Sequence, residues 1–253
     1  MANKTIIYDN KKFDINYNLI NNDKKNIILF LHGWGSNKEI MSSAFSLYLK
    51  DFKHIYIDMP GFGKSSNDYI LNTYDYTNII DIFLKTILDK TLFKNSNRTN
   101  ITDNPFIIIG HSFGGKVATL LNPKLLVLLS SSGILEKKPI LVKLKIFFIK
   151  ILKIFRINLF SKLFRSKDVG NMSENMYQTF KNVLDEDFSY SFSSYENRAL
   201  IFTAIEDKAV SMKSSKKISD LINKSTLYFY EGDHYFFIKQ SKYISLQIEN
   251  DIF

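Results

Sequence analysis

Short apolar runs alternate with helical patterns along most of this sequence. The segments 5–8 and 13–17 predict two N-terminal strands joined by a turn at 9–11. Continuous apolar runs are typical of strands that are buried on both faces of a parallel sheet, and they occur at 26–31, 54–57, 106–109, 125–129, 199–203 and 227–230. Helical patterns lie between them at 36–49, 76–88, 116–121, 212–222 and 235–249. The pattern predicts an α/β fold with a mostly parallel, doubly wound sheet.

The alternation stops after residue 133 and resumes near residue 196. The intervening stretch contains helical patterns at 140–164 and 175–184 and no clear strand. We therefore predict a core formed by residues 1–133 and 196–253, with a helical cap inserted at 134–195.

The length of 253 residues suits one domain with such an insertion. The absence of cysteine excludes a disulfide scaffold and a thiolate nucleophile. No uncharged apolar run approaches the roughly 18 residues that a membrane span needs. The first residues lead into a polar stretch, so we expect no signal peptide and a cytoplasmic protein.

The net charge of +9 comes from one segment. Residues 137–167 contain ten basic and no acidic side chains, whereas the remainder has 24 basic and 25 acidic ones. This distribution argues against nucleic-acid binding. Four of the basic residues share one side of a helical wheel: Lys143, Lys150, Lys153 and Arg156. We interpret them as the solvated face of a cap helix, and keep peripheral contact with an anionic membrane, or with an acidic or amphiphilic substrate, as the alternative.

A G-x-S-x-G pattern follows the run at 106–109 and precedes a helix, with Ser112 between Gly110 and Gly114. In this context the serine lies on a tight strand-to-helix turn, which exposes its hydroxyl at the end of the sheet. Ser112 is therefore the candidate nucleophile.

A serine nucleophile needs a base, and the chain has four histidines. His54 begins a predicted buried strand, and His32 lies where it shapes a loop. The turn points His111 away from the nucleophile, and we place it at the substrate-binding site. His234 follows the last predicted strand in a loop that can reach Ser112, so we assign it as the base.

The base in turn needs an orienting carboxylate and a site for an oxyanion. Asp207 follows the strand at 199–203 at a suitable spacing, which favours it over its neighbour Glu206 and over the more distant Glu136. The backbone N–H groups of Trp34 and Phe113 form the candidate oxyanion hole, and we assign the ring of Trp34 to substrate binding.

Together these residues resemble the α/β-hydrolases of the serine-hydrolase type, and the order Ser, Asp, His is that of the family. The matching segments are residues 32–35, 58–65, 110–115 and 232–234, together with Asp207. One departure is the turn at 204–206, which lacks the glycine that the family usually has before the acid.

The resemblance implies hydrolysis of an ester, or of an amide or C–C bond, in a small or amphiphilic substrate through an acyl-enzyme. It implies neither a metal nor an organic cofactor. Two alternatives stay open: a non-catalytic binding protein, and a cofactor-free haloperoxidase or lyase that uses the same three side chains.

Overall fold

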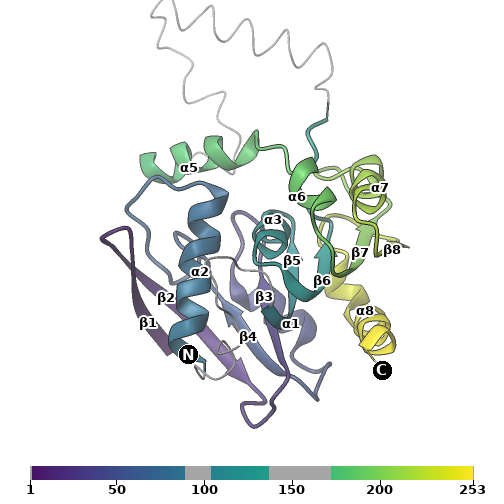
Figure 1. Ribbon diagram of the computed structural model, residues 1–253, viewed down its shortest axis with the longest axis horizontal. Coiled ribbons are helices and arrows are strands. Elements are labelled where there is room, and N and C mark those ends of the chain that lie inside the picture. Colours follow the sequence, from purple (N-terminus) through teal and green to yellow (C-terminus); the bar gives the residue numbers. More distant parts are fainter. Residues whose placement is uncertain (1, 89–103, 137–171, 253) are drawn as a thin grey trace, which may run out of the picture.

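A computed structural model describes residues 2–88, 104–136 and 172–252 of the chain. In these ranges an eight-stranded sheet has the order β1-β2-β4-β3-β5-β6-β7-β8 (Figure 1). The strands are β1 (Ala2–Tyr8), β2 (Lys11–Ile20), β3 (Ile27–Leu31), β4 (Lys53–Ile57), β5 (Asn104–His111), β6 (Pro123–Leu129), β7 (Arg198–Ala204) and β8 (Ser225–Tyr230). β2 is antiparallel to both of its neighbours, and all other pairs are parallel. The predicted fold class is confirmed.

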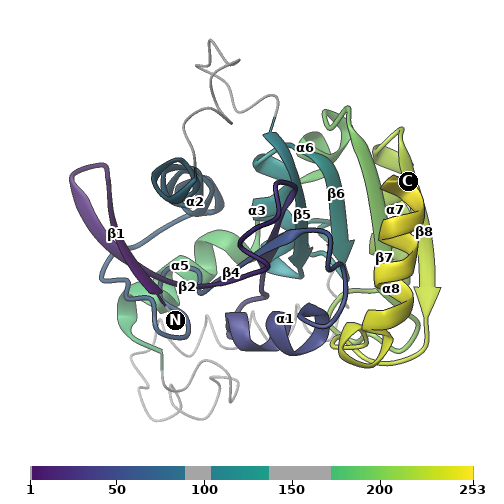
Figure 2. The same ribbon diagram turned by 90° about the horizontal axis from the view of Figure 1, so that it is seen from below.

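The helices cover both faces of this sheet. They are α1 (Lys38–Phe45), α2 (Thr73–Ile87), α3 (Phe113–Leu120), α5 (Glu174–Leu184), α6 (Ser189–Ser193), α7 (Met212–Leu221) and α8 (Phe237–Ile252). The first and last of these, α1 and α8, pack on one face, whereas α2 and α3 pack on the other (Figure 2). Helix α7 packs on the same face as α2 and α3, through Ile218. The sheet is thus the middle of three layers.

The two faces of the central strands explain their continuous apolar pattern. In β3, Ile28 and Phe30 pack into the core under α1 and α8. Leu29 and Leu31 pack into the core under α2 and α3. Because successive side chains of a strand point to opposite faces, a strand covered on both sides must be apolar at every position.

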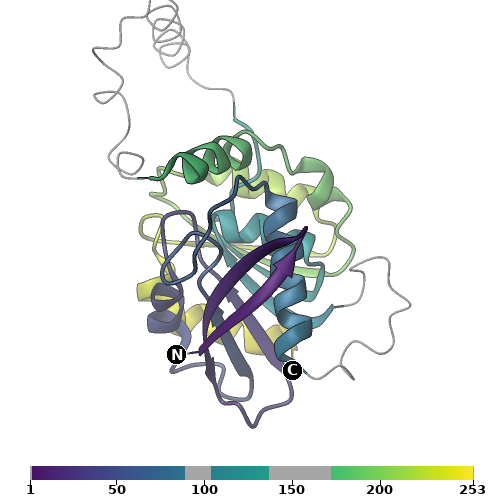
Figure 3. The same cartoon turned by 90° about the vertical axis from the view of Figure 1, so that its left-hand side faces the viewer.

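At the edge of the sheet, the end of β2 differs from the predicted one. The β1–β2 hairpin turns at Asp9 and Asn10, both with positive φ, as the turn chemistry predicts (Figure 3). Beyond the predicted end at Tyr17, β2 continues to Ile20 because these residues pair with β4. That pairing partner is distant in sequence, so the local pattern could not reveal it.

The insertion leaves the sheet between the neighbouring strands β6 and β7. Its described part contains α5 and α6, and α5 crosses above α2 (Figure 1). The basic segment 137–167, with Lys143, Lys150, Lys153 and Arg156, lies outside the described residues, so its membrane contact stays a prediction. None of the helices in the described ranges is long and apolar enough to cross a lipid bilayer.

A buried ion pair joins α1 to the loop after β4. The Lys38 ammonium lies 2.8 Å from the Asp58 carboxylate, and both side chains are fully buried. The Asp58 carboxylate also accepts hydrogen bonds from the backbone N–H groups of Lys38 and Lys64. Gly63 packs so closely on this carboxylate that a Cβ would overlap with it. The pair therefore fixes the loop 58–65, which the sequence analysis singled out.

We expect Lys38→Met to destabilise the fold by about 3–5 kcal/mol, because it leaves a buried carboxylate without its cation. Equilibrium unfolding in urea measures the loss. The control is Lys85→Met, which removes one partner of the more exposed Lys85–Asp81 pair and should cost under about 1 kcal/mol. Equal losses in the two variants would contradict the assigned role of the buried pair.

Candidate active site

Ser112 lies between β5 and α3 in a strained backbone conformation, with φ 51° and ψ −113°. Two glycines make room for this turn. A Cβ on Gly110 would lie 2.5 Å from the carbonyl oxygen of Gly114, and one on Gly114 would lie 2.5 Å from that of Leu31. Neither approach leaves space for a larger residue, which explains the G-x-S-x-G spacing in physical terms.

His234 and Asp207 are brought together by the loops after β8 and β7. The Nδ1 atom of His234 lies 2.7 Å from Oδ2 of Asp207, whose side chain is fully buried. The other carboxylate oxygen accepts the backbone N–H groups of Ala209 and Val210 at 2.7 and 2.9 Å.

Burial acts to raise the pKa of Asp207, but the hydrogen bonds from His234 and Val210 outweigh it and hold this pKa below its usual value. Asp207 is therefore ionised near neutral pH. A carboxylate only accepts hydrogen bonds, so Nδ1 of His234 carries the proton. Nε2 of the neutral ring is then the nitrogen with a free lone pair.

The two alternative carboxylates do not meet His234. Glu206 is exposed, and its backbone N–H donates to the carbonyl oxygen of Gly232. Glu136 accepts hydrogen bonds from the hydroxyl groups of Ser211 and Ser214.

Ser112 and His234 line one cavity of about 840 Å³, together with Trp34 and Phe113. Within the described residues, the backbone N–H groups of Trp34 and Phe113 donate no hydrogen bond. The indole ring packs against Phe62, Phe113 and Phe180 with ring centroids 4.8 to 5.5 Å apart. Trp34 thus contributes both an unpaired amide and an aromatic wall to this cavity.

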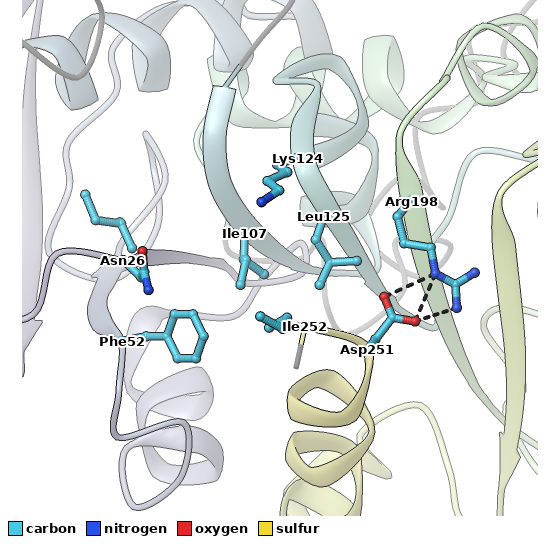
Figure 4. A pocket seen from close by; sticks show the side chains of 9 residues that line it. Asn26, Phe52, Ile107, Lys124, Leu125, Arg198, Asp251 and Ile252 are labelled. Atoms are coloured by element: carbon cyan, nitrogen blue, oxygen red, sulfur yellow. Dashed lines mark hydrogen bonds and ion pairs between the residues drawn. The ribbon is translucent and has the colours of Figure 1, made fainter.

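A second, smaller cavity of about 230 Å³ lies at the opposite edge of the sheet, where the parallel strands begin (Figure 4). It is lined by Arg198, which is paired with Asp251, and by the apolar side chains of Ile107 and Leu125. None of the candidate catalytic residues lines it.

His111 is placed differently from the sequence analysis, which assigned it to substrate binding. Its side chain is buried, and His111 is not among the residues that line the large cavity. The Nε2–H group donates to the backbone carbonyl of His234 at 3.0 Å, and the two rings lie 4.6 Å apart. Burial, reinforced by the nearby His234, lowers the pKa of His111 to about 3, so the ring stays neutral.

The remaining histidines are structural. Nε2 of His32 accepts the backbone N–H of Met59 at 3.0 Å, so its Nδ1 donates to the carbonyl of Gly33. Burial lowers the pKa of His32 to about 4. His54 contacts Tyr56 and a backbone carbonyl through its two nitrogens.

Sequence reasoning missed Lys116, a buried residue of α3 that lines the large cavity. Its ammonium donates to Oε2 of Glu186 at 2.8 Å and to the carbonyl oxygen of Val183 at 2.5 Å. Glu186 in turn accepts hydrogen bonds from the backbone and side chain of Thr73 at the start of α2. A lysine on the apolar side of a short helix was the signal available in the sequence.

Within the described ranges, no group of three or more histidine, aspartate or glutamate side chains is arranged to hold a metal ion.

Comparison with known proteins decides the family. A model of the alpha/beta hydrolase family matches residues 28–198, which is more than half of the chain. The chain belongs to the alpha/beta hydrolase family. Within it, a Mycoplasma genitalium protein whose name places it among the esterases or lipases is 32% identical over 100 residues, which cover 39% of this chain and 33% of that relative. The alignment therefore spans only about a third of that relative's length.

Solved structures share the fold of this alpha/beta hydrolase. An esterase from Thermogutta terrifontis superimposes with a TM-score of 0.72 at 12% identity, over 100% of this chain and 98% of that one. An esterase from Exiguobacterium antarcticum gives a TM-score of 0.70 at 16% identity, over 95% and 96%. These likenesses confirm the fold.

The buried neutral histidines predict a loss of stability in mild acid. In the unfolded chain a histidine has a pKa of about 6.5, whereas in the fold His111 and His32 have pKa values of about 3 and about 4. The unfolded state thus binds more protons in this window. The stabilisation that the two neutral rings give the fold is therefore complete well above about pH 6.5. As the pH falls below this value, the free energy of unfolding decreases by up to about 1.4 kcal/mol per pH unit for each ring.

Urea unfolding at pH 7, 6 and 5 measures how the free energy of unfolding changes with pH. This range lies above the pH at which most carboxylates titrate. The variant His111→Phe should show a shallower slope than the unmodified protein. A free energy of unfolding that stays constant from pH 7 to 5 would contradict the prediction.

Proposed function

We propose that this alpha/beta hydrolase is a serine hydrolase that cleaves carboxylic esters through an acyl-enzyme. The observation that carries the proposal is the 2.7 Å hydrogen bond between Asp207 and His234, in a cavity that Ser112 also lines. A neutral imidazole held by a buried carboxylate is the base that a serine hydroxyl needs to become a nucleophile.

The proposed reaction begins when Nε2 of His234 takes the proton of the Ser112 hydroxyl as its oxygen attacks the ester carbonyl. The backbone N–H groups of Trp34 and Phe113 donate to the negative oxygen that forms. His234 then gives its proton to the leaving alcohol, and an acyl-Ser112 ester remains. Water activated by His234 hydrolyses this ester and restores the hydroxyl.

Three observations support this assignment. Phe113 is the first residue of α3, where a backbone N–H has no partner within the helix. Asp207 is oriented by two backbone N–H groups, so His234 is held without a mobile support. The names of the compared relatives favour an ester over an amide or a C–C substrate.

The alternative of a non-catalytic binding protein is tested at Ser112. Ser112→Ala removes the nucleophile from a site with little packing to lose, and we expect a fall in kcat of about 10⁴ to 10⁶-fold. A fluorophosphonate probe should label the unmodified protein and not this variant. Activity within tenfold of the unmodified protein, or equal labelling of both, would contradict the role of Ser112.

The carboxylate is tested by a pair of neighbouring residues. Asp207→Asn should lower kcat by about 10⁴-fold, because an amide no longer holds His234 in the required tautomer. Glu206→Gln is the matched control, since Glu206 is exposed and His234 is hydrogen-bonded to Asp207 instead, and its activity should stay within about twofold. Hydrolysis of p-nitrophenyl esters reports both rates, and the reverse ranking would move the acid to Glu206.

A further inference from the structure

The walls of the large cavity differ in chemistry. One wall is formed by α5, by the residues just before it and by the two residues of the candidate oxyanion hole. Its apolar side chains are those of Trp34, Phe113, Met172, Phe180 and Val183. Three charged side chains also lie there: Lys116 and Glu186 form an ion pair, and Asp185 follows the end of α5. The wall formed by the segment after β6 and the segment 209–214 carries most of the oxygen atoms, in Ser131, Ser132, Glu136, Ser211 and Ser214, beside the apolar side chains of Ile134, Leu135 and Val210.

The oxygen-rich wall lies on the His234 side of the cavity. Ala209 and Val210 hold the carboxylate that orients His234, and Ser211 follows them directly in the chain. Ser211 and Ser214 both donate to Oε1 of Glu136, which brings this carboxylate to the same side.

Reaction chemistry assigns each half of an ester to one wall. The leaving oxygen must come within hydrogen-bond reach of His234, because this residue protonates it. The alcohol half therefore lies against Glu136 and its serines, and the acyl half lies against the apolar wall. A cavity of about 840 Å³ has room for both.

Glu136 has unused capacity as an acceptor. Its Oε1 atom accepts the two serine hydroxyls, whereas Oε2 has no hydrogen bond to the described residues. The hydrogen bonds from Ser211 and Ser214, aided by the charge of Lys213, lower the pKa of Glu136, so it is ionised. An ionised carboxylate accepts hydrogen bonds only, and the matching ligand is a donor.

We propose that the site selects esters of an apolar acyl chain with a polyol, whose free hydroxyl groups donate to Glu136. This rests on the proposed function and goes further by naming the leaving group. Glycerol is the simplest alcohol of this kind.

The test compares three hexanoate esters that differ only in the alcohol: monohexanoylglycerol, ethyl hexanoate and hexanoylcholine. In the unmodified protein we expect kcat/KM for the glycerol ester to exceed that for the ethyl ester by roughly tenfold or more, as for a hydrogen bond to a charged group. Glu136→Leu should reduce this ratio to about 1. Glu196→Leu removes an exposed carboxylate outside the cavity and should leave the ratio unchanged.

Each outcome decides a different point. Hydrolysis of the esters with a ratio near 1 in the unmodified protein, or a ratio that survives Glu136→Leu, overturns the polyol assignment alone. A faster choline ester overturns it in favour of a cationic alcohol. Absence of hydrolysis of all three, together with no fluorophosphonate labelling of Ser112, overturns the proposed function itself.

Discussion

The close approach of α3 to the end of β3 is the constraint on which the candidate site depends. Gly114 meets the backbone carbonyl groups of Leu31 and His32 with no room for a Cβ. This contact places Ser112 beside the loop that carries Trp34. The Ser112 N–H donates to the carbonyl of Leu129 at 3.0 Å, so the turn is also tied to β6. A serine in a strained conformation is thus fixed from two neighbouring strands, and its position is set by backbone and not by mobile side chains.

Electrostatics then separates the histidines into two groups. His32 and His111 are buried and neutral, and each uses one N–H group to hold a backbone carbonyl. His234 is partly exposed, and its Nδ1 atom lies 2.7 Å from the carboxylate of Asp207. The same side chain is therefore structural in one environment and a candidate base in another, and burial together with the neighbouring charge makes the difference.

The sequence predicts those parts of the molecule that follow from strand order. Ser112, Asp207 and His234 each come directly after a predicted parallel strand, and the carboxyl ends of such strands meet at one edge. The position of His111 could not be predicted, because its partner is a backbone carbonyl 123 residues away. Lys116 was missed for the same reason, since its partners lie in the insertion. Local patterns reveal which residues are buried, but not which distant atoms form hydrogen bonds with their polar groups.

The contacts of Lys116 bear on how the insertion can be exchanged. Its ammonium holds the last turn of α5 through Val183, and Glu186 links it to the first residue of α2, Thr73. A chimera that replaced the whole of 134–195 would leave the buried ammonium of Lys116 without its partners. A graft that retains 172–195 preserves its partners, so for protein engineering this stretch belongs with the core even though it lies within the insertion.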